Sequence, residues 1–230
     1  MSETREIIHR VIRDKGILKQ DVFYNTRQVF QDLRLVLKEV LADIERRFAG
    51  ADQRVTFDLR DKGDFQTEMK IAGDVLIFQM HTNVFQIDQS HSLWKSGYLK
   101  DHPENSYVGI INIYNFLADS FKYQRLTDVG YLIGRIFVNR EDHFLVQGKR
   151  QLGYQFNDFV NAKLDHAAMT QVVEAALMYT LDFDLLTPPY ENMQILSVEE
   201  IQGMGHSQVL ATGKRLGFQF GLNPNPDGGH

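Results

Sequence analysis

Apolar residues recur at every third or fourth position along the first 48 residues, which is the spacing of amphipathic helices. Residues 2–15 predict a short helix that ends at Gly16, because glycine often terminates helices. A longer helix is predicted to begin with Asn25 or Thr26 as its N-cap and to end near Phe48. Its buried stripe is expected to comprise Val29, Phe30, Leu33, Val36, Leu37, Val40, Leu41, Ile44 and Phe48.

The period of the pattern changes to two near residue 54, which is typical of β-strands with one buried face. The predicted strands are 55–60, 65–72, 74–88, 107–115, 131–138 and 144–149. A helical turn is expected at residues 119–122. Residues 88–106 are polar and rich in turn formers, and a connection of this length is usually functional or poorly ordered.

The helical period returns at residues 164–181, with apolar positions Met169, Val172, Val173, Ala176, Leu177 and Leu181. Two prolines then predict an extended stretch at residues 187–189. The sequence from Ser197 to Glu200 resembles a capping box, which predicts a short helix ending at Gly203 or Gly205.

This order of elements indicates an α+β fold with an antiparallel sheet of five to seven strands and two or three long helices packed on one face. We expect one domain over residues 1–220, in which 1–50 are helical, 54–151 form the sheet and 162–205 contain the C-terminal helices. Residues 221–230 are rich in Gly, Pro and Asn and are expected to be disordered. The pattern does not decide which sheet face the helices cover.

Composition narrows the class of protein. The 230 residues are 43% hydrophobic and 24% charged, as in ordinary globular proteins, and they contain no apolar run long enough for a membrane span. The net charge of −5 argues against a broad nucleic-acid interface, because such interfaces neutralise many phosphates. The absence of cysteine excludes disulfides and thiolate chemistry. Since the N-terminus also lacks the pattern of a signal peptide, a cytoplasmic location is expected.

Polar residues interrupt the strand predicted at 74–88, where amide and imidazole side chains alternate with large apolar ones. Such a strand is either a solvated sheet face or the floor of a pocket. The candidate ligand-binding residues on this strand, its neighbours and the following connection are Gln79, His81, Asn83, Trp94, Lys95, Asn112, Tyr114 and Arg135. A polar or charged group between apolar strand residues orients ligands, binds anions, or simply reaches solvent.

The candidate catalytic residues are His81 as a general base and Asp88 or His91 as its partner. The histidines at 81, 91 and 102 do not have the spacing of an established metal site, so no metal is expected. No cofactor motif is recognisable.

A short sequence occurs twice, as LVQGKRQLGYQF at residues 145–156 and as LATGKRLGFQF at residues 210–220. Each Gly-Lys-Arg site, at 148–150 and 213–215, either binds phosphate or forms a solvated turn at a strand end. Neither site lies in a glycine-rich nucleotide loop, so the turn is the favoured interpretation.

Three function classes remain open. The favoured hypothesis is a cytoplasmic binding or regulatory module, a homodimer, that uses the second sheet face or the connection after residue 88 to bind a small ligand or a protein. One alternative is an enzyme that acts on a small polar or phosphorylated substrate with His81 as base. The other is a structural scaffold that binds a protein through the surface of the helix at 25–48.

Overall fold

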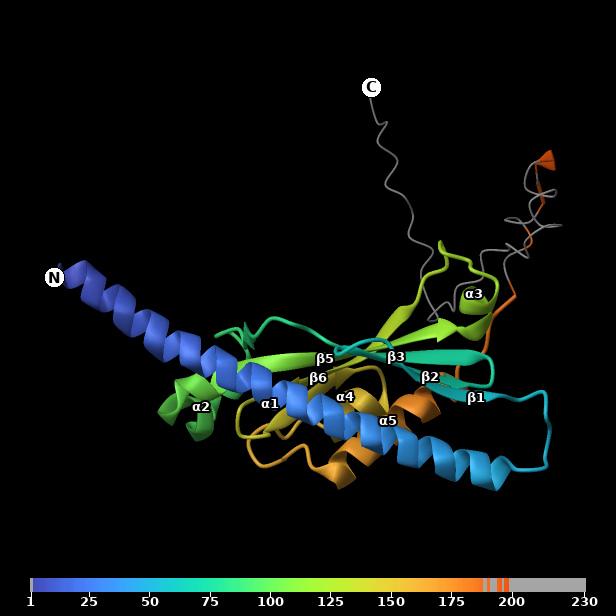
Figure 1. The fold of residues 1–230 in the computed structure, drawn as a ribbon, viewed down its shortest axis with the longest axis horizontal. Coiled ribbons are helices and arrows are strands. Elements are labelled where there is room, and N and C mark those ends of the chain that lie inside the picture. The colour runs from blue at the N-terminus through green and yellow to red at the C-terminus, as the bar shows by residue number, and fades with distance from the viewer. Residues whose placement is uncertain (1, 188–189, 191–193, 196, 199–230) are drawn as a thin grey trace.

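Seven strands within the residues that the structure describes form one antiparallel sheet, in the order β1-β2-β3-β5-β6-β7, with β4 paired to β5 outside this path (Figure 1). The structure is a computed structural model that describes residues 2–187, 190, 194–195 and 197–198. The strands are β1 (Phe57–Asp61), β2 (Gln66–Ile71), β3 (Asp74–Met80), β4 (Phe85–Gln86), β5 (Tyr107–Leu117), β6 (Tyr131–Val138) and β7 (Phe144–Gly148).

Two long helices, α1 (Glu3–Phe48) and α5 (His166–Leu181), pack on one face of this sheet (Figure 1). The shorter helices are α2 (Gly97–Asp101), α3 (Ala118–Lys122) and α4 (Gln151–Gln155), and two 3-10 helices occur at Ser92–Lys95 and Pro103–Ser106. The predicted α+β fold class, with an antiparallel sheet and long helices on one face, is therefore confirmed.

The prediction of two N-terminal helices is wrong, because α1 continues without a break through Gly16 for 46 residues. An isolated glycine inside a helix costs about 1 kcal/mol relative to alanine, which does not end a helix whose neighbours are good helix formers. Asn25 and Thr26 are consequently interior residues and not caps. The amide of Asn25 instead donates to the carbonyl oxygen of Asn139 at 2.8 Å, which ties the helix to the turn between β6 and β7. The predicted end at Phe48 is confirmed, and Gly50 follows with φ +84°.

The core lies between the sheet and the two long helices. On β3, the side chains of Leu76, Phe78 and Met80 face the helices and are buried. Because side chains alternate along a strand, Gln79 points to the opposite face, where it is exposed. We call this second face, which α1 and α5 do not cover, the open face. The pattern of burial thus shows that the long helices cover the sheet face opposite Gln79, which the sequence pattern did not decide.

Helix α1 lies directly against the backbone of β5. A Cβ atom added to Gly109 would come within 2.0 Å of Oγ1 of Thr26, which is fully buried. The hydroxyl of Thr26 is itself held by a 2.6 Å hydrogen bond to the carbonyl oxygen of Val22. Glycine is therefore required at position 109 for this close approach.

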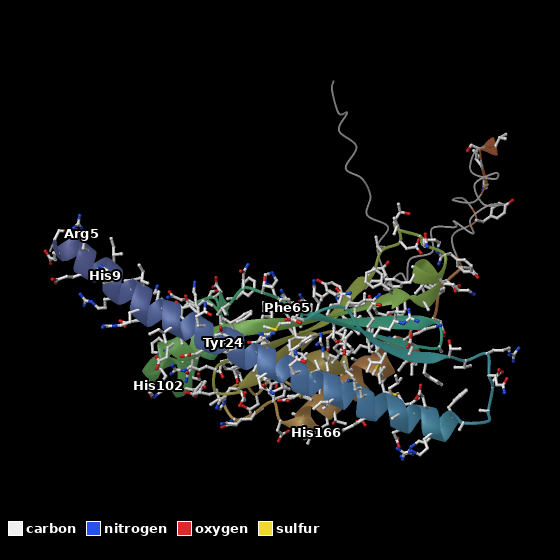
Figure 2. The ribbon with its side chains drawn as sticks, viewed as in Figure 1. Arg5, His9, Tyr24, Phe65, His102 and His166 are labelled. Atoms are coloured by element: carbon white, nitrogen blue, oxygen red, sulfur yellow. The ribbon has the colours of Figure 1, made fainter. Side chains whose placement is uncertain are left out.

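The N-terminal part of α1 extends beyond the sheet (Figures 1 and 2). Figure 2 shows Arg5 and His9 on this projecting end, away from the sheet. Four apolar residues on the same turns are between about half and two-thirds exposed, namely Ile7, Ile8, Val11 and Ile12. Their helical positions continue the stripe that is buried further along at Val22 and Val29, so the apolar face of α1 extends past the part of the sheet that covers it.

Most of the predicted strands are confirmed within two or three residues, and so are the turn at 119–122 and the helix ending at Leu181. The strand predicted at 74–88 is wrong in its second half. Strand β3 ends at Met80, and Phe85–Gln86 form β4, which pairs with β5. His81 and Asn83 therefore lie after β3 and do not share its face with Gln79.

Short helices in the 88–106 connection and α4 were not predicted, because helices of four or five residues show no recurring apolar stripe. Several predictions lie wholly or mostly outside the described residues. They are the extended stretch at 187–189, the helix beginning at Ser197, the second copy of the repeated sequence at 210–220 and the disordered tail at 221–230. The boundaries of the single domain stay a prediction.

Candidate functional site

A row of polar side chains crosses the open face at one level of the sheet. The strand register aligns one residue on each of five adjacent strands, namely Gln66, Gln79, Asn112, Arg135 and Gln147. All five point away from the long helices, because their neighbours in sequence face the core. The row therefore forms a polar band across a sheet whose other face is apolar.

Arg135 is the only charged member of this polar row. Its Nη2 donates a hydrogen bond to Oε1 of Gln147 on the neighbouring strand, and its guanidinium lies 5.3 Å from the ring centroid of Phe137. Within the part of the chain that the structure describes, Arg135 forms no salt bridge. Arg135 is partly exposed and its hydrogen bond to Gln147 lies at the surface, whereas Arg34 pairs with Asp61 at 3.2 Å.

The cross-strand row of residues next to the polar row on the open face is apolar. Ile110, Phe137 and Leu145 lie opposite one another on β5, β6 and β7. Phe85, Ile87 and Leu93 come from the chain that follows β3 and lie beside them around the same cavity. An apolar surface thus adjoins the polar row along the strands.

The connection at 88–106 forms a wall of this site and is held by its own small core. Leu99, Val108 and Phe159 are buried together there, on the open face. Trp94 packs against this small core, and its indole N–H donates to the carbonyl oxygen of Ile87 at 3.2 Å. The connection is therefore an ordered wall rather than a loose loop.

A buried polar network fixes the same wall to the turn between β6 and β7. The Asn139 side chain is fully buried and donates to the hydroxyl of Tyr98 at 2.9 Å, and this hydroxyl donates to Glu141 at 2.8 Å. Desolvation raises the pKa of Tyr98 well above its ordinary value, and the Glu141 carboxylate raises it further, against an opposing effect of Asn139. Tyr98 consequently stays protonated and can keep donating.

Together these elements line a pocket of about 800 Å³ that is open to solvent on one side, which we call the open-face pocket. Its size is within the range of small-molecule sites. Six of the predicted site residues line it, namely His81, Asp88, His91, Asn112, Tyr114 and Arg135. The lining residues that the sequence did not indicate include Phe85, Leu93, Phe137, Leu145, Gln147 and Asn157.

Asn112 has an unusual environment in this pocket. It is 9% exposed, and its side-chain amide has no hydrogen-bond partner among the described residues. Its amide atoms keep some contact with solvent, since they are not among the fully buried atoms that lack a partner. A polar group that is nearly buried, faces a cavity and has no protein partner is suited to bind a ligand or water there.

The remaining predicted site residues lie outside the pocket lining. Gln79 is exposed beside Asn112, and Lys95 is exposed on the connection. Asn83 is also exposed, and its backbone N–H donates to Nδ1 of His81 at 3.0 Å. Trp94 supports the wall from behind.

The expected acid–base pair is not assembled in this conformation. Nδ1 of His91 accepts from the backbone N–H of Leu93 at 3.3 Å, as Nδ1 of His81 does from that of Asn83. The Asp88 carboxylate accepts from the hydroxyl and the backbone N–H of Ser90, and these hydrogen bonds hold the pKa of Asp88 below its ordinary value. In the described part of the chain, no carboxylate is hydrogen-bonded to either imidazole.

A metal or phosphate site has little support. No group of three or more His, Asp or Glu side chains that could hold a metal ion occurs in the residues described. The third histidine, His102, is exposed near α2 and lies 3.4 Å from Glu104 (Figure 2). At the first Gly-Lys-Arg site, Arg150 pairs with Asp182 and lies over the ring of Tyr179, so this arginine connects α4 to α5.

The described part of the chain contains no helix that is both long and apolar enough to span a membrane. No protein family, curated protein or solved structure matches this chain.

Proposed function

We propose that the protein is a non-enzymatic module that binds a small molecule in the open-face pocket. The observation that carries this proposal is Asn112, a residue that is nine-tenths buried and lines the pocket, and whose amide has no hydrogen-bond partner among the described residues. Ligand sites are typically apolar cavities with a few polar groups that fix orientation, and the pocket combines such a surface with Asn112, Tyr114 and Arg135.

A binding function is favoured over catalysis because of the histidine contacts. A general base needs a free nitrogen and is commonly oriented by a carboxylate. His81 uses Nδ1 to bind a backbone N–H, and the Asp88 carboxylate is engaged by Ser90. The scaffold alternative has no comparable support, since much of α1 between residues 22 and 41 is buried against the core.

Thermal unfolding with a panel of small carboxylates, sugars, nucleotides and amines tests this proposal. A ligand at a hundred times its dissociation constant stabilises the folded state by about 2.7 kcal/mol, which raises Tm by about 5–10 °C for a chain of this size. Two exposed glutamines of the polar row supply matched variants, because Gln147 lines the pocket and Gln79 does not.

Gln147→Trp fills the pocket, and we expect it to abolish the thermal shift. Gln79→Trp adds the same ring to the same face and is expected to preserve the shift. A shift that survives Gln147→Trp places the ligand elsewhere, and no shift with any compound argues against the proposal.

The cytoplasmic location and the homodimer are further parts of the proposal. The absence of cysteine is compatible with a reducing compartment. The apolar stripe of α1 that continues beyond the sheet supports a contact with a second copy.

A further inference from the structure

We propose that the ligand of the open-face pocket is an apolar molecule that carries a single carboxylate. This inference rests on the proposed function, because it names the chemical class that the pocket would take. It is argued from the charge of Arg135, from the neighbouring unpaired amide and from the apolar surface beside them.

The first argument is the unneutralised charge of Arg135. A guanidinium has five N–H donors, and the described contacts of Arg135 include one hydrogen bond, to the neutral amide of Gln147. The remaining donors form a planar fork that fits the two oxygens of a carboxylate, and such charge-assisted pairs are about twice as strong as neutral hydrogen bonds.

The second argument is the position of Asn112 opposite Arg135 in the strand register. Its unpaired amide and the free donors of Arg135 are adjacent members of the polar row. A carboxylate held by the guanidinium can therefore also accept from the Asn112 NH₂ group. One ligand group would then bind two neighbouring polar side chains of the pocket, Asn112 and Arg135.

The third argument distinguishes a carboxylate from a phosphate. The described residues that line the pocket include one arginine, no lysine and one aspartate. Hydrogen bonds from Ser90 keep Asp88 ionised by lowering its pKa, so a negative charge is present at the same pocket. The Asp88 carboxylate repels an anionic ligand, and this repulsion is larger for a dianionic phosphate, which is usually met by several cations or by a glycine-rich loop, than for a single carboxylate.

The fourth argument concerns the rest of the ligand. Ile110, Phe137 and Leu145 form the apolar level next to the polar row, and Phe85 and Leu93 face the same cavity. A ligand with its carboxylate at Arg135 therefore meets an apolar surface along the strand direction. Its body is expected to be aromatic or aliphatic, because burial of such surface contributes about 25 cal/mol per Å².

The test compares acids with their neutral amides. Binding of hexanoate, 4-phenylbutanoate and indole-3-acetate is measured by calorimetry or saturation-transfer NMR, beside the corresponding carboxamides and phenyl phosphate. We expect at least one acid to bind the wild type at least tenfold more tightly than its amide. We also expect phenyl phosphate to bind more weakly than that acid.

Two arginines on the open face provide matched variants. Arg135→Gln removes the charge in the pocket, and it is expected to weaken binding of the acid at least tenfold. Arg60→Gln removes an exposed arginine on β1 that pairs with Asp58, and it is expected to leave binding unchanged. Arg135→Lys retains the charge without the fork and should lie between the wild type and Arg135→Gln. Circular dichroism establishes that each variant is folded.

The outcomes separate this inference from the proposed function. If acids and amides bind equally well and Gln147→Trp abolishes the binding of both, the carboxylate inference is wrong but the pocket is still a binding site. Tighter binding of phenyl phosphate than of any acid also overturns it. If no compound of this or the earlier panel binds the folded wild type, both the inference and the proposed function are wrong.

Discussion

Asn139 and Tyr98 are 41 residues apart in sequence, and a buried hydrogen bond of 2.9 Å joins the Asn139 amide to the Tyr98 hydroxyl. Asn139 belongs to the turn after β6, and Tyr98 belongs to the connection that walls the open-face pocket. The same asparagine also accepts from the backbone N–H groups of Glu141 and His143 at 2.9 and 3.0 Å. One side chain thus organises both the turn and the wall.

We expect Asn139→Ala to lower the free energy of unfolding by about 2–4 kcal/mol, because it leaves several buried groups without partners. Denaturation in urea measures this change. Asn161→Ala is the control, since Asn161 is exposed and its side chain bonds only the nearby Asp158. The control should change stability by less than about 1 kcal/mol. An equal effect of the two variants would contradict the role assigned to Asn139.

The stabilising effect of Tyr98 is expected to depend on pH. Burial raises its pKa in the folded state, so its neutral form is favoured there, and the unfolded value is about 10. The contribution of Tyr98 is therefore complete below pH 10 and declines as the pH rises above it. Urea unfolding of the wild type and Tyr98→Phe at pH 8 and pH 11 measures the difference between them. We expect this difference to shrink at the higher pH, and a constant difference would count against the buried-phenol interpretation.

Gly153→Ala is expected to destabilise the protein by about 1–3 kcal/mol. The added Cβ would lie 2.5 Å from the carbonyl oxygen of Gly148, which is backbone and cannot rotate away. Since both glycines line the pocket, the same substitution should also weaken ligand binding. Thermal unfolding tests the first effect, and a variant as stable as the wild type would show that this contact is not tight.

Gly16→Ala should have the opposite effect. No atom lies within 4 Å of a Cβ at this position, and alanine favours helix over glycine by about 1 kcal/mol. We expect slower amide hydrogen exchange over the projecting end of α1, measured by mass spectrometry. Gly16→Pro is expected to speed exchange in the same segment. Fast exchange near residue 16 that neither variant changes would favour two separate helices.

The chain is expected to form a dimer through the projecting part of α1, with a mass twice the 26.6 kDa of one chain. Light scattering after gel filtration measures this mass. Ile8→Lys together with Ile12→Lys should produce a monomer, because charges then interrupt the exposed apolar stripe. Leu35→Lys is the control, as Leu35 is similarly exposed on α1 but lies away from that stripe. A monomeric wild type would refute the prediction.

Local periodicity was sufficient to predict most of the fold. The hairpin of β6 and β7 follows from alternation on both sides of a four-residue polar turn, and its register brings Arg135 opposite Gln147. That pairing could have been inferred from the sequence, although Gln147 was not recognised as a site residue. In contrast, the position of Gly16 could not be interpreted correctly from local signals, because the same glycine fits a helix end and a helix interior.

The site was only partly predictable because it depends on distant contacts. The wall is held by Phe159, which packs beside Leu99 and Val108, and no periodic pattern relates these three residues. The strand predicted to continue to Asp88 ends at Met80, and this end turns His81 toward the pocket while leaving Asn83 outside. Sequence alternation indicated which residue types were unusual, whereas tertiary packing determined which of them meet.

The contact between Thr26 and Gly109 has a mechanical consequence. Because only the short side chain of Thr26 separates α1 from the backbone of β5 at this point, the helix and the strand have little freedom to slide past one another. Strand β5 carries Ile110 and Asn112, whose side chains line the pocket. A movement of the projecting end of α1 would therefore be transmitted through Thr26 to β5 and so to the two pocket residues on that strand.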